Sequence, residues 1–265
     1  MNFVLIDASY FIFYRYHALR VWWAKARKEN DEKLIDSIEF VDKFKKTFIS
    51  KIEEMNKKLN IKQSIKIIGK DCPQNQIWRN KLISNYKYNR EITDVGEFFK
   101  LTFDNNLFKL GGIALELEYP SLEADDCIAL TSKYLHEKFP SANIFIITSD
   151  HDYLQLNKER IHLLDLKYNY LNQSKTSFND PKKDLFVKIV SGDKSDNIPS
   201  IIPNCGIKTA VKYYENPLLF KKLLSENKSA KDQFEINRQI IDFEYIPLDI
   251  KIKFIKLLEI IKGEA

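Results

Sequence analysis

Three short runs of apolar, β-favouring residues constrain the fold most, because each is followed by an acidic residue and is separated from the next by a longer stretch. The pairs of run and acid are residues 3–6 with Asp7, residues 65–68 with Asp71, and residues 143–148 with Asp150. Between the first two runs, apolar side chains recur every three or four positions, as in a helix, at Phe40, Phe44, Phe48, Ile52 and Met55. The order strand, helix, strand predicts an α/β domain with a mostly parallel central sheet flanked by helices.

The texture of the chain changes after about residue 190. A turn-rich segment, SGDKSDNIPSIIPNCGIKTA, leads into basic amphipathic stretches that continue to Ala265. We therefore expect two parts that pack directly on each other: an α/β core at residues 1–190 and a smaller helical subdomain at residues 191–265.

Composition narrows the class of protein. The 265 residues are 44% hydrophobic, which is enough for a full core and argues against disorder. No apolar run approaches the length of about 18 residues that predicts a membrane span, and no basic region precedes the apolar N-terminus. We expect an intracellular protein without a signal peptide or membrane segment, in the cytoplasm or at the nucleoid. The three cysteines are far apart, so neither a disulfide framework nor a zinc knuckle is indicated.

Nine acidic residues stand in five short motifs, several of them at predicted strand ends. They are Asp7, Asp71, Glu123, Asp125, Asp126, Asp150, Asp152, Asp193 and Asp196. Each motif alone also fits a helix-capping or turn role. Their recurrence where parallel strands end favours a common site, because ligands of such sheets lie at the carboxyl edge. Carboxylates without histidine or thiol partners suit Mg²⁺ or Mn²⁺ rather than zinc.

The motif at residues 123–126 allows a geometric expectation. If it is helical, Glu123 and Asp126 share one face at a spacing of three, and Asp125 is rotated away from Glu123. Asp125 would then act through metal-bound water.

A basic stretch with interleaved aromatic residues follows Asp71. It carries Arg79, Lys81, Lys87 and Arg90. If the stretch is one helix, Arg79, Lys87 and Arg90 lie on a single stripe that could hold a phosphate or line a channel for a single strand. The alternative is a solvated cationic face with its aromatic residues in the core. Trp22 and Trp23 are further candidates for contact with a DNA branch point.

Taken in order, these motifs resemble the 5′ nuclease family, which includes flap endonucleases, the 5′ nuclease domain of bacterial DNA polymerase I and the phage RNase H enzymes. The matching segments are LIDASYFIF, GKDCPQNQIWRNKLISNYKYNR, LEADDCIA, IITSDHDYLQL, and SGDKSDNIP with GIKTA. They run from residue 3 to about 210, and DFEYIP at residues 242–247 resembles the phage branch.

The resemblance implies a PIN-like core with a helix-hairpin subdomain and a hydrolase that uses two metal ions, Mg²⁺ or Mn²⁺. It assigns the metal ligands to the nine acids: Asp7, Asp71, Glu123 and Asp126 to the catalytic ion, and Asp150, Asp152, Asp193 and Asp196 to the second, with Asp125 also in the set. It assigns catalytic roles to Arg79 and Lys87 and phosphate binding to Arg79, Lys87 and Arg90. The implied partner of a monomeric enzyme is flapped, nicked or 5′-ended DNA duplex, or an RNA·DNA hybrid. The turn at Gly206, Lys208 and Thr209 precedes a helix and is suited to a duplex phosphate.

Two departures from the family pattern matter. The second aspartate normally stands in an FDG motif, whereas here Asp71 is assigned by its distance from the YKYNR segment. The hairpin loop keeps only Gly206 of the usual glycines, which leaves K⁺ binding there open. Two other hypotheses remain: a branched-DNA-binding protein with reduced catalysis, and an RNase of the related PIN fold, which would lack the GDKSDNIP subdomain.

Overall fold

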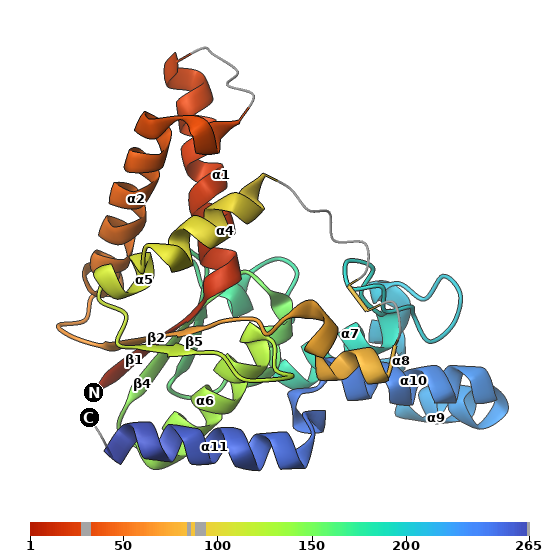
Figure 1. Cartoon of the computed structure of the whole chain (residues 1–265). Coiled ribbons are helices and arrows are strands. Elements are labelled where there is room, and N and C mark those ends of the chain that lie inside the picture. The colour runs from red at the N-terminus through yellow and green to blue at the C-terminus, as the bar shows by residue number, and fades with distance from the viewer. Residues whose placement is uncertain (28–32, 84–85, 88–93, 264–265) are drawn as a thin grey trace.

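A computed structural model describes residues 1–27, 33–83, 86–87 and 94–263, and its centre is a sheet of five parallel strands in the order β3, β2, β1, β4, β5 (Figure 1). The strands are β1 (Asn2–Asp7), β2 (Ile65–Gly69), β3 (Leu115–Leu117), β4 (Asn143–Ile147) and β5 (Ile161–Leu164). The predicted parallel α/β architecture is confirmed, and the three predicted strands are β1, β2 and β4. The short edge strands β3 and β5 had not been predicted.

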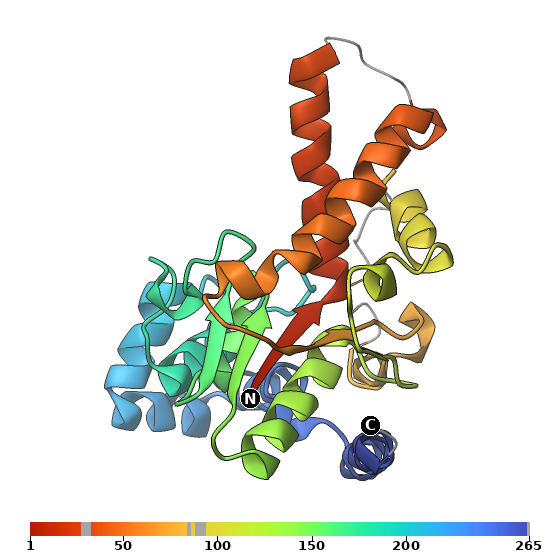
Figure 2. The same cartoon turned by 90° about the vertical axis from the view of Figure 1, so that its left-hand side faces the viewer.

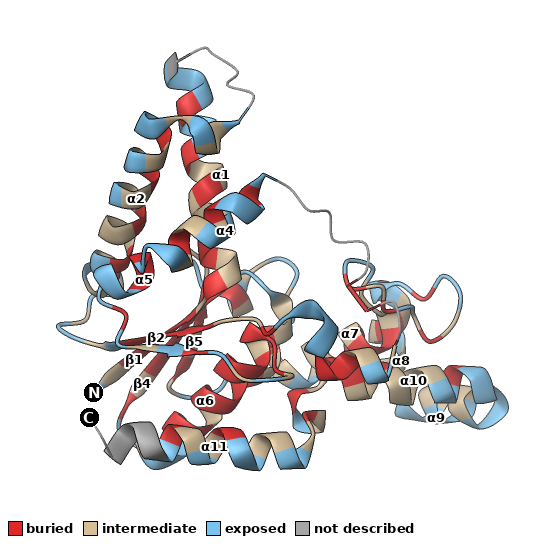
Figure 3. Ribbon diagram, in the orientation of Figure 1, coloured by how far each residue is buried: buried red, intermediate tan, exposed pale blue. Residues whose placement is uncertain are grey.

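Helices cover both faces of the sheet (Figure 3). Both faces are apolar because successive side chains of each strand point to opposite faces. Val4 and Ile6 of β1 point to one face, and Phe3 and Leu5 point to the other. The first face packs against α1 (Ala8–Arg27), α2 (Ile38–Glu53), α3 (Met55–Lys58), α4 (Val95–Asp104) and α5 (Leu107–Leu110). The second face packs against α6 (Ala124–Lys138), which is covered in turn by α11 (Leu248–Gly263).

Helix α1 begins at the carboxyl end of β1, and α1 and α2 project together away from the sheet (Figures 1 and 2). All five apolar residues of the predicted helical pattern between residues 40 and 55 are fully buried, which confirms that pattern as the inner side of α2 and α3. The two tryptophans of α1 differ. Trp23 is buried against Phe40, whereas Trp22 is 48% exposed and has the Lys43 ammonium 4.0 Å from its ring centroid.

A second group of helices lies beside the carboxyl edge of the sheet (Figure 1). It consists of α7 (Pro181–Ser191), α8 (Ile207–Glu215), α9 (Pro217–Glu226) and α10 (Lys228–Ile241), which we call the helical unit. After α10 the chain returns to the core, where Phe254 and Leu258 of α11 join the cluster that contains Tyr134 of α6. The helical unit therefore begins at Pro181 and ends at Ile241, and the division into domains at residue 190 stays a prediction.

Short 3₁₀ helices connect these elements: η1 (Leu34–Asp36), η2 (Gln74–Gln76), η3 (Trp78–Lys81), η4 (His151–Leu156), η5 (Leu171–Gln173) and η6 (Phe243–Tyr245). Within the part of the chain that the structure describes, no helix has both the length and the apolar character needed to cross a membrane.

Candidate metal centre and nucleic-acid interface

Asp7 and Asp71 come together because the parallel strands β1 and β2 end at the same edge of the sheet. Asp7 pairs in register with Gly69, two residues before Asp71. A Cβ atom at Gly69 would lie 2.6 Å from the carbonyl oxygen of Ala124, so glycine permits the start of α6 to approach. Asp71 accepts hydrogen bonds from the Ala124 N–H (2.8 Å) and the Ser9 hydroxyl (2.6 Å). Its carboxylate thus lies at the positive end of the α6 dipole.

Asp125 and Asp150 complete an acidic pocket of about 190 Å³ with Asp7 and Asp71. Asp150 follows β4, and its N–H donates to the Thr148 hydroxyl (3.0 Å). Asp125 lies in the first turn of α6. The remaining lining residues are Ser9, Tyr10, Lys87, Thr148 and Ser149. Acids from four separate segments therefore meet at the carboxyl edge of the sheet, the place that the strand order predicts for a ligand.

The pocket favours a bound cation. Burial and then the charge of Asp71 raise the pKa of Asp7 to about 7, although a hydrogen bond from the Tyr10 N–H (3.0 Å) opposes the rise. A divalent cation between these carboxylates would turn their repulsion into attraction. A set of aspartate oxygens fits hard cations such as Mg²⁺ and Mn²⁺.

Glu123 and Asp126 lie behind this pocket, bound to a buried arginine. They form a capping box at the start of α6, so they share a face as expected. Arg79 donates two hydrogen bonds to Asp126 (both 2.7 Å) and one to Glu123 (2.8 Å), and Trp78 donates another to Asp126 (2.9 Å). Oxygens of Glu123, Asp125 and Asp126 come within 4.8 Å of one another, but the guanidinium already neutralises two of them. Asp125, expected to turn away, is the member that lines the pocket.

Lys87 is a cation of the pocket wall. Its Nζ donates to Glu123 (2.6 Å) and lies 3.6 Å from an Asp196 carboxylate oxygen. Its backbone is left-handed (φ 54°), and its N–H donates to the Asp196 carbonyl (3.3 Å). Burial alone would lower the pKa of Lys87, but the charge of Glu123 outweighs it and the pKa is raised well above the usual value. Asp196 thus lies with Lys87 and not with the other acids expected to hold a second ion.

The other three acids of that expected second group gather around Lys188 of α7. Its Nζ contacts Asp152 and lies 2.9 Å from Asp193 and 3.9 Å from Asp150. Burial acts to raise the pKa of Asp193, but Lys188 and hydrogen bonds from Ser195 outweigh it and lower the pKa to about 2. A lysine therefore provides the positive charge at the place where the resemblance puts a second ion.

The basic stretch after Asp71 is not one helix. The helix η3 ends at Lys81, and the left-handed backbone at Lys87 interrupts any continuous turn, so the expected stripe from Arg79 to Lys87 does not form. Arg79 is 2% exposed because it neutralises two buried carboxylates of α6, and it does not face solvent. Lys81 is exposed. Arg90 lies outside the described residues.

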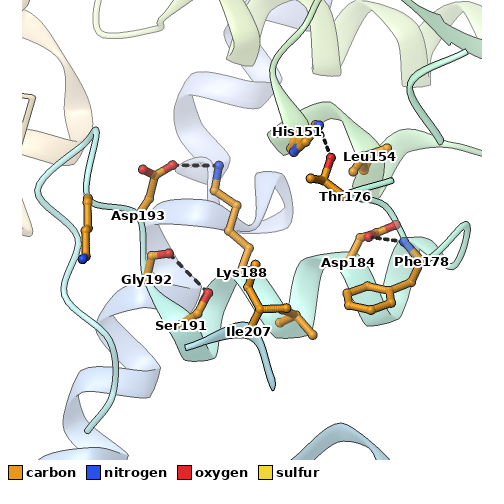
Figure 4. A pocket seen from close by; sticks show the side chains of 12 residues that line it. His151, Leu154, Thr176, Phe178, Asp184, Lys188, Ser191, Gly192, Asp193 and Ile207 are labelled. Carbon is orange, nitrogen blue, oxygen red and sulfur yellow. Dashed lines mark hydrogen bonds and ion pairs between the residues drawn. The ribbon is translucent and has the colours of Figure 1, made fainter. Parts of the chain in front are cut away.

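The helical unit presents the start of α8 toward the second acid group. Gly206 precedes α8, and Gly206 and Lys208 are exposed while Thr209 is half-buried. Asn204 takes the left-handed conformation (φ 58°) that asparagine tolerates. A cavity of about 260 Å³ lies here, lined by His151, Thr176, Phe178 and Lys194 among others. Figure 4 shows Lys188 reaching toward Asp193 in this cavity, with Ile207 of α8 in the wall. The cavity therefore lies between the start of α8 and Asp193.

The comparison with known families shows to which family the chain belongs. Residues 2–183, more than half of the chain, match the family model described as the 5′-3′ exonuclease N-terminal resolvase-like domain. The chain belongs to the 5′-3′ exonuclease family. Members of this family are nucleases, so the predicted class of protein is confirmed. No match to the chain was found among curated proteins.

Solved structures of bacteriophage T5 proteins share the fold of this 5′-3′ exonuclease family member. The T5 D15 protein crystallised with metal ions superposes with a TM-score of 0.67 at 18% identity, covering 98% of this chain and 99% of that one. The T5 D15 flap endonuclease in a complex with DNA and metal ions gives 0.65 at 18% identity over the same shares. The T5 5′-exonuclease with bound zinc gives 0.65 at 16% identity, covering 97% of each chain.

Several residues of this candidate site had not been singled out in the sequence. Lys188 bonds the second acid group, and the buried Tyr153 hydroxyl donates to Asp7 (3.4 Å). Gln155 bonds backbone groups of α10 and η6. The only sign in the sequence that Lys188 belongs to the site was its position five residues before Asp193. Nothing local distinguishes Gln155 from a surface glutamine.

Proposed function

We propose that this member of the family is a structure-specific 5′-3′ exonuclease and flap endonuclease that hydrolyses phosphodiester bonds at 5′ ends or flaps of DNA. The observation that carries the proposal is the acidic pocket at the carboxyl edge of the sheet, formed by Asp7, Asp71, Asp125 and Asp150 with Lys87 in its wall. Four carboxylates and one lysine beside an open surface suit a reaction on a phosphate that needs divalent cations.

The residues divide into two groups for metal binding. Asp7, Asp71, Asp125 and Asp150 would hold one ion, Mg²⁺ or Mn²⁺, and Asp152 and Asp193 would hold a second after Lys188 moves aside. Ions held by these residues would supply an activated water and charge stabilisation at the leaving 3′ oxygen. Glu123 and Asp126 would not bind the ions directly, because they bind Arg79.

Basic and backbone groups of the protein would contact the phosphates of the substrate. Lys87, fixed by Glu123 at 2.6 Å, would neutralise the charge that develops on the scissile phosphate. The exposed turn at Gly206, Lys208 and Thr209 would bind a duplex phosphate away from the cut, since backbone N–H groups at a helix start favour anions. The T5 D15 flap endonuclease complex, which contains DNA and metal ions, supports DNA as the partner.

A cleavage assay tests the proposal. The full chain would be incubated with 5′-labelled flap, nicked, blunt and RNA·DNA hybrid substrates, with Mg²⁺ or with a chelator. We expect flap and 5′-end products that require the ion, and a loss of at least about 100-fold for Asp125→Asn, because the ion carries most of the charge stabilisation. Asp249→Asn, an exposed aspartate of α11, is the matched control. Binding without cleavage would favour the catalytically reduced alternative, and undiminished cleavage in chelator would refute the metal mechanism.

A further inference from the structure

Arg79 bonds both the acid-bearing end of α6 and the helical unit. Its Nη atoms bind Glu123 and Asp126, and its Nε donates to the carbonyl oxygen of Ile240 (2.8 Å). Ile240 is the penultimate residue of α10, where carbonyl groups have no partner within the helix. The guanidinium thus caps α10 and neutralises Glu123 and Asp126, between which Asp125 lies in the sequence. One side chain therefore links the two parts of the molecule at the pocket.

A second side chain ties the same end of α10 to the other acid-bearing segment. Gln155 donates to the carbonyl oxygens of Ile241 (3.0 Å) and Asp152 (2.8 Å) and accepts from the N–H of Phe243 (2.9 Å). The last carbonyls of α10 are therefore held by two donors, one bound to the α6 acids and one bound to the segment of Asp152. A displacement of α10 would break these bonds or carry both acid segments with it.

The other end of this linkage lies in the part of the helical unit proposed to face the duplex. Asn237, one turn before Ile240, is fully buried and donates to the carbonyl oxygens of Ile189 in α7 and Pro199 (2.8 Å each). Pro199 belongs to the turn that precedes α8. Hydrogen bonds of Asn237 and Arg79 thus connect the turn before α8, through α7 and α10, to the acids of α6. A displacement of α8 would strain these bonds, because leaving a buried polar group unpaired is costly.

We propose that Arg79 is a positioning residue that couples the seating of duplex DNA on the helical unit to the placement of the carboxylates in the acidic pocket. The inference rests on the proposed function, since it takes α8 as a duplex contact and the pocket as the metal site. Coupling is reciprocal: duplex DNA strengthens cation binding by the same factor by which the cation strengthens duplex binding. Arg79 itself touches neither ligand.

Calorimetric titration measures the coupling without cleavage. Ca²⁺ is titrated into the full chain alone and into its complex with a saturating flap duplex, and the ratio of the two Kd values is the coupling factor. We expect at least about fivefold for the natural chain, the lower end of typical allosteric coupling. Arg79→Lys keeps a positive charge beside Asp126, but one ammonium cannot also reach Ile240. Its factor should fall below about twofold, with Ca²⁺ affinity in the absence of DNA kept within about threefold.

Two more variants separate positioning from general loss of structure. Lys133→Ala removes a surface ion pair with Glu244 (2.5 Å) that also joins α6 to the returning chain, and it should keep the full factor. Gln155→Ala removes the second connection between α10 and the segment of Asp152 and should lower the coupling factor. This variant replaces Arg79→Lys in the test if Arg79→Lys does not fold. Equal coupling in the natural chain and in the folded variants, or no coupling in the natural chain, overturns the proposal. Failure of the natural chain to cleave DNA with Mg²⁺ would instead refute the proposed function.

Discussion

Replacing Asp7 by asparagine is expected to stabilise the metal-free protein at pH 8 and to change its stability little at pH 4. Asp7 is ionised at a cost, because burial and the nearby Asp71 raise its pKa from 3.8 to about 7. Asparagine keeps the acceptor for the Tyr10 N–H and removes the charge.

The size and the sign follow from the two pKa values. Between pH 4 and pH 7 the native protein holds a proton on Asp7 that the unfolded chain has lost, so the free energy of unfolding falls as the pH rises. The loss in the free energy of unfolding that ionised Asp7 causes reaches its full size above about pH 7. A shift of about 3 pKa units at about 1.4 kcal/mol each sets a ceiling of about 4 kcal/mol on the gain from Asp7→Asn at pH 8, with under about 1 kcal/mol at pH 4.

Urea unfolding in the presence of chelator at pH 4, 6 and 8 measures this gain. Asp232→Asn, an exposed aspartate of α10, makes the same change in charge and should have no such pH trend. Saturating Mg²⁺ should shrink the gain at pH 8, because about 100 times the Kd adds about 2.7 kcal/mol to the stability of the protein that binds the ion. A gain that is equal at pH 4 and pH 8, or a variant that Mg²⁺ stabilises as much as the natural chain, would refute the reasoning.

The remaining predictions concern the roles of single residues. Asp150→Asn should abolish cleavage while flap affinity, measured as Kd, stays within about tenfold, because metal ligands serve chemistry more than affinity; retained cleavage would remove Asp150 from the site. Lys208→Ala should weaken duplex binding and flatten its salt dependence by roughly one charge, whereas Lys87→Ala should mainly lower the single-turnover rate of bound substrate; matching profiles would contradict this division. Gly192→Ala should lower the free energy of unfolding by about 2 kcal/mol or more, because the backbone is left-handed (φ 72°) and a Cβ would lie 2.4 Å from the Ile198 carbonyl. Its control is Gly96→Ala, whose added Cβ meets no atom of the described residues within 4 Å, and it should be neutral or stabilising in urea unfolding.

The sequence by itself determined the local structure and the chemical character of the site. Short runs of apolar, β-favouring residues marked β1, β2 and β4, and the spacing of Phe40, Phe44 and Phe48 marked α2, because these patterns are local properties of the chain. The strand ends also predicted where acids gather, since parallel strands end at one edge. The three-residue β3 and four-residue β5 were missed because runs that short carry little periodic signal.

Only the tertiary structure decided which charged groups meet. Arg79 reads in the sequence as a member of an exposed basic stripe, yet it is buried on Asp126, 47 residues away, and on the Ile240 carbonyl, 161 residues away. Helical spacing placed Glu123 and Asp126 on one face, but it could not show that a guanidinium occupies this face and that Asp125 lines the acidic pocket. Lys188 likewise reaches three acids that lie on two segments. A residue type fixes what a side chain can bond, but its partner is set by packing between distant segments, which no local pattern contains.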